Sequence, residues 1–431
     1  MERTDNSVVI LAAGVGSRFL SNIPKVFHKI GGLSMLDHVI RTAKETKSSR
    51  IVAILSPKYK DANLAFTSDI KKAYQDIPRG TADAVKCGLK LLPEDSEGWV
   101  YVLYGDIPLI SSETLQKLSL ISRECSKTAV VILAMDSNGT NDLGKLEIDE
   151  HGRVKSIIEA KDISDSNRII PLCNAGLFIK KDILKQFIEK IKPNSLTGEF
   201  YITKIVQLAY EAGYVCRYHK GDQKELLGVN TKSELATLEK IFQERERQKH
   251  MKNGVTLIAP ETVFFSYDTH IENDVVIYPY VVFGENVCIK SGAQVGPFAH
   301  LRAGTNIQNE VRIGNFVEIK NSVISEKSKV NHLSYIGDAY LGKNTNIGAG
   351  TITCNYDGFR KHKTVIGENV FVGSNTALVA PVEIQDDVVI GAGSVIVKDV
   401  ASGSLAIARS DQKNIANRAI NLRKMKKCAG S

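Results

Sequence analysis

A six-residue repeat constrains the fold of this chain more than any other feature of its sequence. The apolar positions of the repeat are Ile271, Ile277, Phe283, Ile289, Val295, Leu301, Ile307, Ile313, Ile319, Leu341, Ile347, Ile366, Val372, Leu378, Ile384, Ile390 and Ile396. Each apolar position from Ile271 to Ile319 is followed, four residues later, by a small or β-branched residue. These are Val275, Val281, Val287, Ala293, Ala299, Thr305, Val311, Val317 and Val323. A period of six fits neither an α-helix nor an alternating strand, and it predicts a parallel β-helix over residues 263–400.

The repeat is interrupted at Gly337–Tyr340 and over a longer stretch within Thr353–Val365. Residues inserted into a regular solenoid project from its surface, where functional side chains tend to lie. We therefore expect both interruptions to lie close to a site.

The segment from Leu11 to Lys25 is the most informative part of the N-terminal half. It follows a short apolar run, Val8–Leu11, whose composition is typical of a buried parallel strand. Its small residues let a phosphate approach backbone N–H groups, and Arg18 and Lys25 supply positive charge. The segment is therefore expected to bind an anion.

Two familiar glycine motifs fit this loop badly. Position 19 is Phe where a dinucleotide fingerprint needs its third glycine, and the Gly-Lys-Ser/Thr of a Walker A loop is absent. An ordinary strand-to-helix turn rich in small residues is the plain alternative. The signature Leu-Ala-Ala-Gly-x-Gly-x-Arg, followed by Pro24 and Lys25, instead resembles that of the sugar nucleotidyltransferases.

A chain of 431 residues exceeds one ordinary core, so two domains are expected. Before residue 231, strand-like runs such as Ile51–Leu55, Trp99–Leu103 and Ala129–Leu133 alternate with helical stretches such as Ser111–Ser119. This alternation predicts an α/β domain with a largely parallel sheet over residues 1–230. The repeats and a basic tail form the second domain, residues 255–431.

A helical arm over residues 231–254 is predicted to connect the domains. Thr231 and Glu234 have the spacing of a capping box, and Asn253-Gly254 is a stop signal. The apolar face of this helix comprises Leu235, Leu238, Ile241 and Phe242, and Glu244–Lys249 is almost entirely charged.

Composition narrows the function classes. No apolar run reaches the length of a membrane span and Met1–Ser7 lacks the features of a signal peptide, so a cytoplasmic protein without stable membrane insertion is expected. The 7 cysteines include no C-x-x-C pair, which argues against a disulfide framework or zinc site. The net charge of +8 favours anionic ligands without demanding nucleic acid. Part of it lies in the tail from Arg409 onward, which is predicted to be a solvated or disordered end, with phosphate or nucleic-acid contact as the alternative.

Taken in this order over nearly the whole chain, the two halves resemble the bifunctional N-acetylglucosamine-1-phosphate uridyltransferases and glucosamine-1-phosphate acetyltransferases. The resemblance implies a Rossmann-like nucleotidyltransferase domain followed by a left-handed parallel β-helix. It also implies that the second domain acetylates glucosamine 1-phosphate with acetyl-CoA, and that the first couples the product to UTP, giving UDP-N-acetylglucosamine and pyrophosphate. Mg²⁺ as cofactor and a homotrimer are further implications.

Site residues of the first half follow from matching motifs. Lys25 and Arg18 match catalytic positions, and Asp106 with Asn230 matches the Mg²⁺ ligands. Positions matching the UTP and UDP-sugar contacts are Leu11, Ala12, Ala13, Gly14, Lys25, Gln75, Gly80, Thr81, Tyr104, Gly105, Asp106, Gly144, Glu159, Asn174 and Asn230. Among these, Gln75, Gly80 and Thr81 would contact uracil. Lys145 and Lys204 depart from the Arg and Asp of the family pattern.

In the second half, His332 in Asn-His-Leu-Ser-Tyr matches the general base. An ammonium group cannot attack a thioester, and a neutral imidazole can take its proton near neutral pH. Positions matching the sugar-phosphate contacts are Arg302, Lys320, Tyr335, Asn346, Asn355, Tyr356 and Lys361. Those matching the acetyl-CoA contacts are Ala349, Ser374, Ala392 and Arg409.

Two alternatives stay open at this point. One is a monofunctional sugar-1-phosphate nucleotidyltransferase whose β-helix only assembles subunits. The other is a non-catalytic scaffold that retains the fold. His332, Lys320 and the excursion from Asn355 to Lys361 argue against the first, because a purely structural solenoid needs none of them. The second predicts no turnover with either substrate pair.

Overall fold

The computed structural model describes residues 4–14, 16–61, 65, 70–93, 98–137, 143–163 and 170–428. Val15 of the glycine-containing loop and the last residues of the basic tail lie outside this range. The chain forms two compact units, Met1–Arg245 and Glu246–Ser431, so the division falls inside the segment expected to be a connecting arm.

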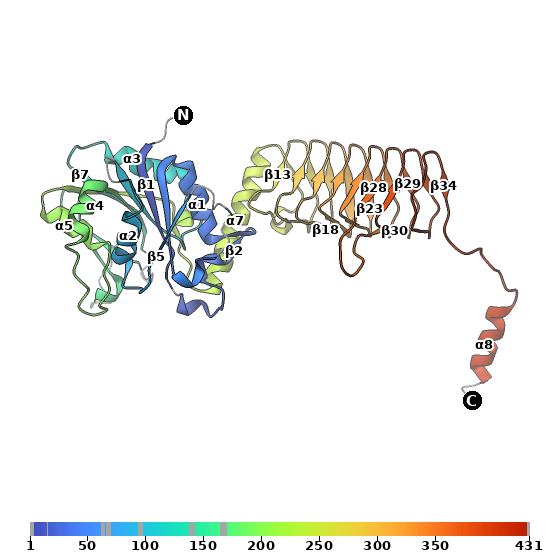
Figure 1. The fold of residues 1–431 in the computed structure, drawn as a ribbon, viewed down its shortest axis with the longest axis horizontal. Helices are drawn as coiled ribbons and strands as arrows, with labels where there is room; N and C mark the ends of the chain where they lie inside the picture. Colours follow the sequence, from blue (N-terminus) through green and yellow to red (C-terminus); the bar gives the residue numbers. More distant parts are fainter. Residues whose placement is uncertain are drawn as a thin grey trace. The chain divides into compact units, whose positions relative to one another are not determined.

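Unit 1 contains a mostly parallel sheet (Figure 1). Its strand order is β11 (Val215–Lys220), β7 (Thr128–Asp136), β10 (Leu172–Lys180), β6 (Trp99–Tyr104), β1 (Thr4–Leu11), β4 (Ser48–Leu55) and β5 (Lys71–Tyr74). Strand β10 runs antiparallel to both of its neighbours. A hairpin of β8 (Lys145–Ile148) and β9 (Val154–Ile158) pairs with β10. Elsewhere β2 (Lys29–Ile30) pairs with β3 (Leu33–Ser34).

Helices cover both faces of this sheet. Val8 and Ile10 belong to one apolar cluster with α1 (Met35–Glu45) and α3 (Ser112–Ser122), whereas Val9 belongs to a second cluster with α2 (Thr81–Leu89), α4 (Lys181–Ile188) and α5 (Lys204–Glu211). Alternate side chains of a strand point to opposite faces, so burial on both faces explains why the second half of β1, Val8–Leu11, is a continuous apolar run. The predicted α/β fold is confirmed.

Helix α7 (Lys232–Lys252) has the predicted capping box. The backbone N–H of Glu234 donates to Thr231 Oγ1 at 3.2 Å, and the backbone N–H of Thr231 donates to Glu234 Oε2 at 2.9 Å. A short helix, α6 (Gln223–Leu226), comes just before it. The charged stretch near the end of α7 is not fully solvated, because Arg247 is buried and its guanidinium donates to the carbonyl groups of Val263 and Glu261.

Unit 2 is a parallel β-helix of three sheets (Figure 1). The first sheet contains β12 (Thr256–Leu257), β14 (Val276–Ile277), β17 (Gln294–Val295), β20 (Arg312–Asn315), β23 (Lys329–His332), β26 (Asn346–Ile347), β29 (Phe371–Val372), β32 (Val389–Ile390) and β34 (Leu405–Ala406). The second contains β13 (His270–Ile271), β16 (Cys288–Ile289), β19 (Asn306–Ile307), β22 (Val323–Ile324), β25 (Ala339–Leu341), β28 (Thr364–Ile366) and β31 (Val382–Ile384). The third contains β15 (Val282–Phe283), β18 (Ala299–Leu301), β21 (Val317–Lys320), β24 (Tyr335–Gly337), β27 (Ile352–Cys354), β30 (Ala377–Val379) and β33 (Val395–Ile396).

The apolar residues of the repeat line the interior of this β-helix, as predicted: each of them from Ile271 to Ile396 is buried. The prediction was wrong at Val323, which is only half-buried, while Ser322 and Ile324 on either side of it are buried. Asn306 pairs with Val323, so this coil has 17 residues rather than 18. A strand slip of one residue exchanges inward and outward positions, which moves Val323 out of the core.

The longer interruption forms a loop between β27 and β28 that projects from the β-helix (Figure 1). Tyr356 and Lys361 form an isolated antiparallel bridge in it, and the Asp357 carboxylate accepts from two backbone N–H groups. The basic tail contains α8 (Arg418–Cys428). Within the described residues, no helix combines the length and apolar character needed to cross a membrane.

Candidate active sites

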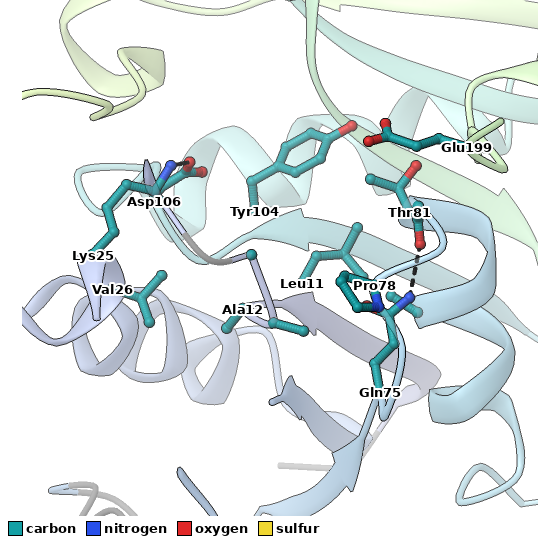
Figure 2. A pocket seen from close by; sticks show the side chains of 15 residues that line it. Leu11, Ala12, Lys25, Val26, Gln75, Pro78, Thr81, Tyr104, Asp106 and Glu199 are labelled. Carbon is teal, nitrogen blue, oxygen red and sulfur yellow. Dashed lines mark hydrogen bonds and ion pairs between the residues drawn. The ribbon is translucent and has the colours of Figure 1, made fainter. Parts of the chain in front are cut away.

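A cavity of about 470 Å³ in unit 1 lies at the carboxyl ends of β1 and β6 (Figure 2). This edge is where α/β sheets bind ligands. Of the positions matched to UTP contacts, the cavity is lined by Leu11, Ala12, Ala13, Gly14, Lys25, Gln75, Gly80, Thr81, Tyr104 and Asp106. Pro78, Ala84 and Glu199 also line it and were missed, because no motif marks them.

Two glycines allow the close approaches that shape this cavity. Gly16 has φ 65°, and a Cβ there would lie 2.9 Å from Lys25 Cβ. Gly80 has φ 114°, and a Cβ there would lie 2.6 Å from the backbone nitrogen of Phe200. Both positions therefore favour glycine for backbone conformation and for space.

Lys25, Asp106 and Asn230 converge at one end of the cavity. Lys25 Nζ donates to Asp106 Oδ2 at 2.5 Å and to Asn230 Oδ1 at 3.0 Å. Asp106 follows β6, and its carbonyl accepts from the N–H of Val229, which brings the segment before α7 to the same point. Two residues distant in sequence, Asp106 and Asn230, thus hold the Lys25 ammonium between them.

One of the matched sugar positions, Asn174, contacts the cavity residue Tyr104. Asn174 Nδ2 donates to the Tyr104 hydroxyl at 3.1 Å, and burial raises the pKa of that hydroxyl. The Glu159 carboxylate accepts from the Thr203 hydroxyl, and burial also raises the pKa of Glu159. Gly144 lies beside Glu159, because a Cβ added at Gly144 would lie 3.5 Å from Glu159 Oε1.

The remaining positions of this half lie around these groups. The backbone N–H of Gly105 donates to the Leu11 carbonyl at 2.9 Å, which joins β6 to the loop. Arg18 lies on a short 3-10 helix, Ser17–Phe19, with an exposed side chain that does not line the cavity. Lys145 is buried and donates to Ser137 Oγ at 2.7 Å, and Lys204 begins α5, where its charge acts on Glu159.

In unit 2, His332 ends β23 and pairs in register with Asn315 of β20. His332 Nδ1 lies 2.9 Å from Asn315 Oδ1. An amide oxygen only accepts, so Nδ1 carries the proton and Nε2 keeps the lone pair of a base. Sequence analysis missed Asn315, whose position follows from the 17 residues of the coil that separates it from His332.

A line of residues continues from His332 along the same corner of the β-helix. Val330, Ile347, Val372 and Ile390 pair in register, so the residues two positions later occupy equivalent places on successive coils. These are His332, Ala349, Ser374 and Ala392. Arg409 Nη1 donates to the Ala392 carbonyl at 2.9 Å, which adds a cation at the far end of the line.

Lys320 ends β21 on the third sheet, and two further cations act on it. The Lys361 ammonium, which comes from the projecting loop, lowers the pKa of Lys320. Arg302 adds to this shift, and its guanidinium pairs with Glu318 at 2.8 Å. Like charges held this close favour an anion between them.

Polar side chains connect this cationic group to the rest of the matched set. Asn355 Nδ2 donates to Asp338 Oδ2 at 2.5 Å and lies 3.5 Å from the Tyr335 hydroxyl. Tyr356 donates its hydroxyl to the Gly358 carbonyl within the loop. Asn346 pairs with Lys329, three residues before His332 in the same strand. Sequence analysis did not single out Glu318 or Asp338 as contacts of the site, since carboxylates on a solenoid surface carry no spacing signal.

Both halves of the chain match known protein families. Residues 8–143 match the MobA-like NTP transferase domain, residues 283–380 match the GMPPB C-terminal domain, and residues 363–398 match the bacterial transferase hexapeptide repeat. The bifunctional protein GlmU of Wolbachia pipientis wMel is 44% identical over 94% of this chain and 97% of its own length. The proteins of that name from Paramagnetospirillum magneticum and Zymomonas mobilis are each 41% identical, over 95% and 98% of this chain and 94% and 98% of their own lengths. This level of identity extends over both units and nearly the whole length of each protein, so the chain belongs to the bifunctional GlmU family.

Proposed function

We propose that unit 2 acetylates glucosamine 1-phosphate with acetyl-CoA and that unit 1 couples N-acetylglucosamine 1-phosphate to UTP. The observation that carries this proposal is the convergence of each matched residue set within its own unit. Lys25, Asp106 and Asn230 meet in unit 1, and unit 2 contains the contact of His332 with Asn315 and the cationic group.

In the uridyl transfer, a phosphate oxygen of the sugar attacks the α-phosphorus of UTP, and the bond to pyrophosphate breaks. The reaction brings anions together, so its transition state needs positive charge aimed at the phosphates. Lys25 supplies that charge from the end of the cavity where Asp106 and Asn230 hold it. Arg18 would act from the rim of the glycine-containing loop.

The residues at this end of the cavity also fit Mg²⁺. Magnesium prefers oxygen ligands and is bound by one or two protein groups together with substrate phosphates. Asp106 and Asn230 offer two oxygens that already share one cation, the Lys25 ammonium. The described residues contain no cluster of three or more His, Cys, Asp or Glu side chains that could hold a metal without substrate. When bound, Mg²⁺ would neutralise phosphate charge.

The other end of the cavity would hold the uracil, at Gln75, Gly80 and Thr81. The sugar would lie near Tyr104, with Gly144, Glu159 and Asn174 as its contacts. Buried hydrogen-bonding groups of this kind orient a polar ligand, because leaving them unpaired costs free energy.

In the acetyl transfer, His332 Nε2 takes a proton from the amine of glucosamine 1-phosphate as the nitrogen attacks the thioester carbon of acetyl-CoA. The bond from carbon to sulfur then breaks, and the thiolate leaves as CoA. Asn315 fixes the tautomer that this role needs. Arg302, Lys320 and Lys361 would bind the phosphate, with Tyr335, Asn346, Asn355 and Tyr356 around the sugar.

Acetyl-CoA would lie along the line from His332 to Ala392. Adjacent coils lie about 4.8 Å apart, so three coil steps span roughly 14 Å. Small side chains at Ala349, Ser374 and Ala392 leave room for an extended chain, and Arg409 provides a charge for its phosphate groups. The thioester would thereby lie at His332.

We further propose a homotrimer in which acetyl-transfer sites draw residues from neighbouring chains, and a cytoplasmic location, where UTP and acetyl-CoA are available. Closed cyclic symmetry brings the same side of a solenoid against its neighbours in each copy. If His332 and Arg409 of different chains share a site, co-assembled His332→Ala and Arg409→Ala chains should recover part of the activity. Tagged mixed trimers without recovered thiol release would contradict the sharing.

The proposal as a whole is tested by incubating the protein with glucosamine 1-phosphate, acetyl-CoA, UTP and Mg²⁺. Free thiol and pyrophosphate are measured separately. Release of both supports two activities, release of pyrophosphate alone from added N-acetylglucosamine 1-phosphate would favour a monofunctional nucleotidyltransferase, and release of neither would favour a scaffold.

A further inference from the structure

Gln75 lies at the end of the nucleotide cavity opposite Lys25 (Figure 2). It follows β5 directly, its backbone N–H donates to the Leu55 carbonyl at 3.0 Å, and its side chain is 6% exposed. A buried amide in this place presents either its oxygen or its nitrogen to a ligand. Which of the two it presents determines the hydrogen-bonding pattern of the base that fits.

Two acceptors decide the orientation of this amide. Gln75 Nε2 donates to the Gly80 carbonyl at 3.0 Å and to Asp83 Oδ2 at 2.9 Å. A carbonyl and an ionised carboxylate can only accept, so both N–H bonds of the amide are used. The Gln75 Oε1 atom accepts no hydrogen bond from any residue that the structure describes, and it is left for a ligand.

Asp83 lies outside the nucleotide cavity, on the helix that follows Gly80. It lies in the first turn of α2, where the aligned peptide dipoles favour an anion. It does not line the nucleotide cavity and instead lines a separate cavity of about 590 Å³ with Lys86 and Lys185. Asp83 therefore acts on a nucleotide only through Gln75.

We propose that Asp83 is a specificity-determining positioning residue, which holds the Gln75 amide with its oxygen toward the nucleobase and so selects uracil over cytosine. This inference rests on the proposed uridyl transfer. Uracil has an N–H at N3 that can donate to Oε1. Cytosine has a lone pair at N3 in place of this N–H. With the amide fixed, Gln75 Oε1 and cytosine N3 would both be acceptors, so no hydrogen bond forms between them.

The test compares UTP with CTP in wild-type protein and in Asp83→Asn, with N-acetylglucosamine 1-phosphate and Mg²⁺. The asparagine amide can donate as well as accept, so only the Gly80 carbonyl still holds the Gln75 amide in one orientation. The amide can then turn over more easily and offer its N–H groups to cytosine. We expect the ratio of kcat/KM for UTP to that for CTP to fall about 10-fold or more, the value of one charge-assisted hydrogen bond. Most of the change should appear in KM, and equilibrium binding of the two nucleotides without sugar phosphate should show the same loss.

Lys86→Met is the matched control, because Lys86 lies one turn further along α2 and pairs with Glu189 at 2.8 Å. It should keep the wild-type ratio. Thermal melting establishes that the variants are folded, and Asp83→Ala is the second variant if Asp83→Asn is not. An unchanged ratio in a folded variant, with UTP and CTP weakened equally, would overturn the inference and leave Asp83 a structural group. Wild-type protein that uses no UTP would overturn the proposed function itself.

Discussion

The two units of this chain build their sites in opposite ways. In unit 1, Lys25, Asp106 and Asn230 come from distant parts of the sequence and meet only because three loops converge at one edge of the sheet. In unit 2, Asn315 and His332 lie in register on consecutive coils, and the pairing of the next coils continues this line to Ala392. A solenoid converts sequence spacing into position, whereas an α/β sheet assembles its site through tertiary contacts.

The largest effect is expected from a substitution of His332 in unit 2. His332→Ala removes the base, and acetyl transfer should fall about 10²–10⁴-fold, the usual scale of general-base catalysis. Pyrophosphate release from added N-acetylglucosamine 1-phosphate should stay near wild type, because the two sites lie in separate units. His270→Ala, an exposed histidine on β13, is the matched control. Retention of most thiol release would remove His332 from this role.

The second-largest effect is expected in unit 1, at the site formed by Lys25, Asp106 and Asn230. Asp106→Asn keeps the size of the side chain and removes its charge, so Lys25 loses its ion pair and pyrophosphate release should fall about 10²–10³-fold. Thiol release should not change. The control is Asp182→Asn, because Asp182 lies on α4 and its exposed carboxylate pairs with Lys180 at the end of β10. Equal loss of both activities in a folded protein would show that the sites are not independent.

A smaller effect should show whether Asn315 positions the His332 imidazole or only supports the fold. In Asn315→Asp, a carboxylate beside the imidazole favours its charged form and raises the pKa of His332. A base with a raised pKa stays protonated to higher pH, so the acid limb of kcat/KM for acetyl transfer should move up by about one unit. The pH profile of pyrophosphate release is the internal control. An unmoved limb with a lowered rate would mean that Asn315 only supports the fold.

The smallest effect concerns the cationic group of Arg302, Lys320 and Lys361. The Lys361 ammonium lowers the pKa of Lys320, so Lys320 loses its proton at a lower pH than an ordinary lysine does. Affinity for glucosamine 1-phosphate should therefore fall as the pH rises through this lowered pKa. Lys361→Met should weaken binding a few-fold near neutral pH and move the fall to higher pH, as measured by titration calorimetry. Binding with the same pH dependence in both proteins would show that the two lysines do not share one anion.

Sequence alone determined much of this protein. The six-residue period predicted the β-helix and its interior, because each residue of a solenoid contacts only neighbouring coils and local spacing is enough. The loop from Leu11 to Lys25 predicted a phosphate site for a similar reason, since small residues and cations lie together in the chain. The capping box at Thr231 is likewise a local interaction.

The tertiary structure decided what spacing could not express. The slip that makes Val323 half-buried depends on a coil one residue short, which the inward pattern on either side does not reveal. Asn315 became a partner of His332 only once the register was known, and Asp83 met Gln75 only when α2 packed beside β5. Hydrogen bonds need atoms within about 3 Å and correctly aligned, and only packing of the folded chain brings distant side chains to that distance.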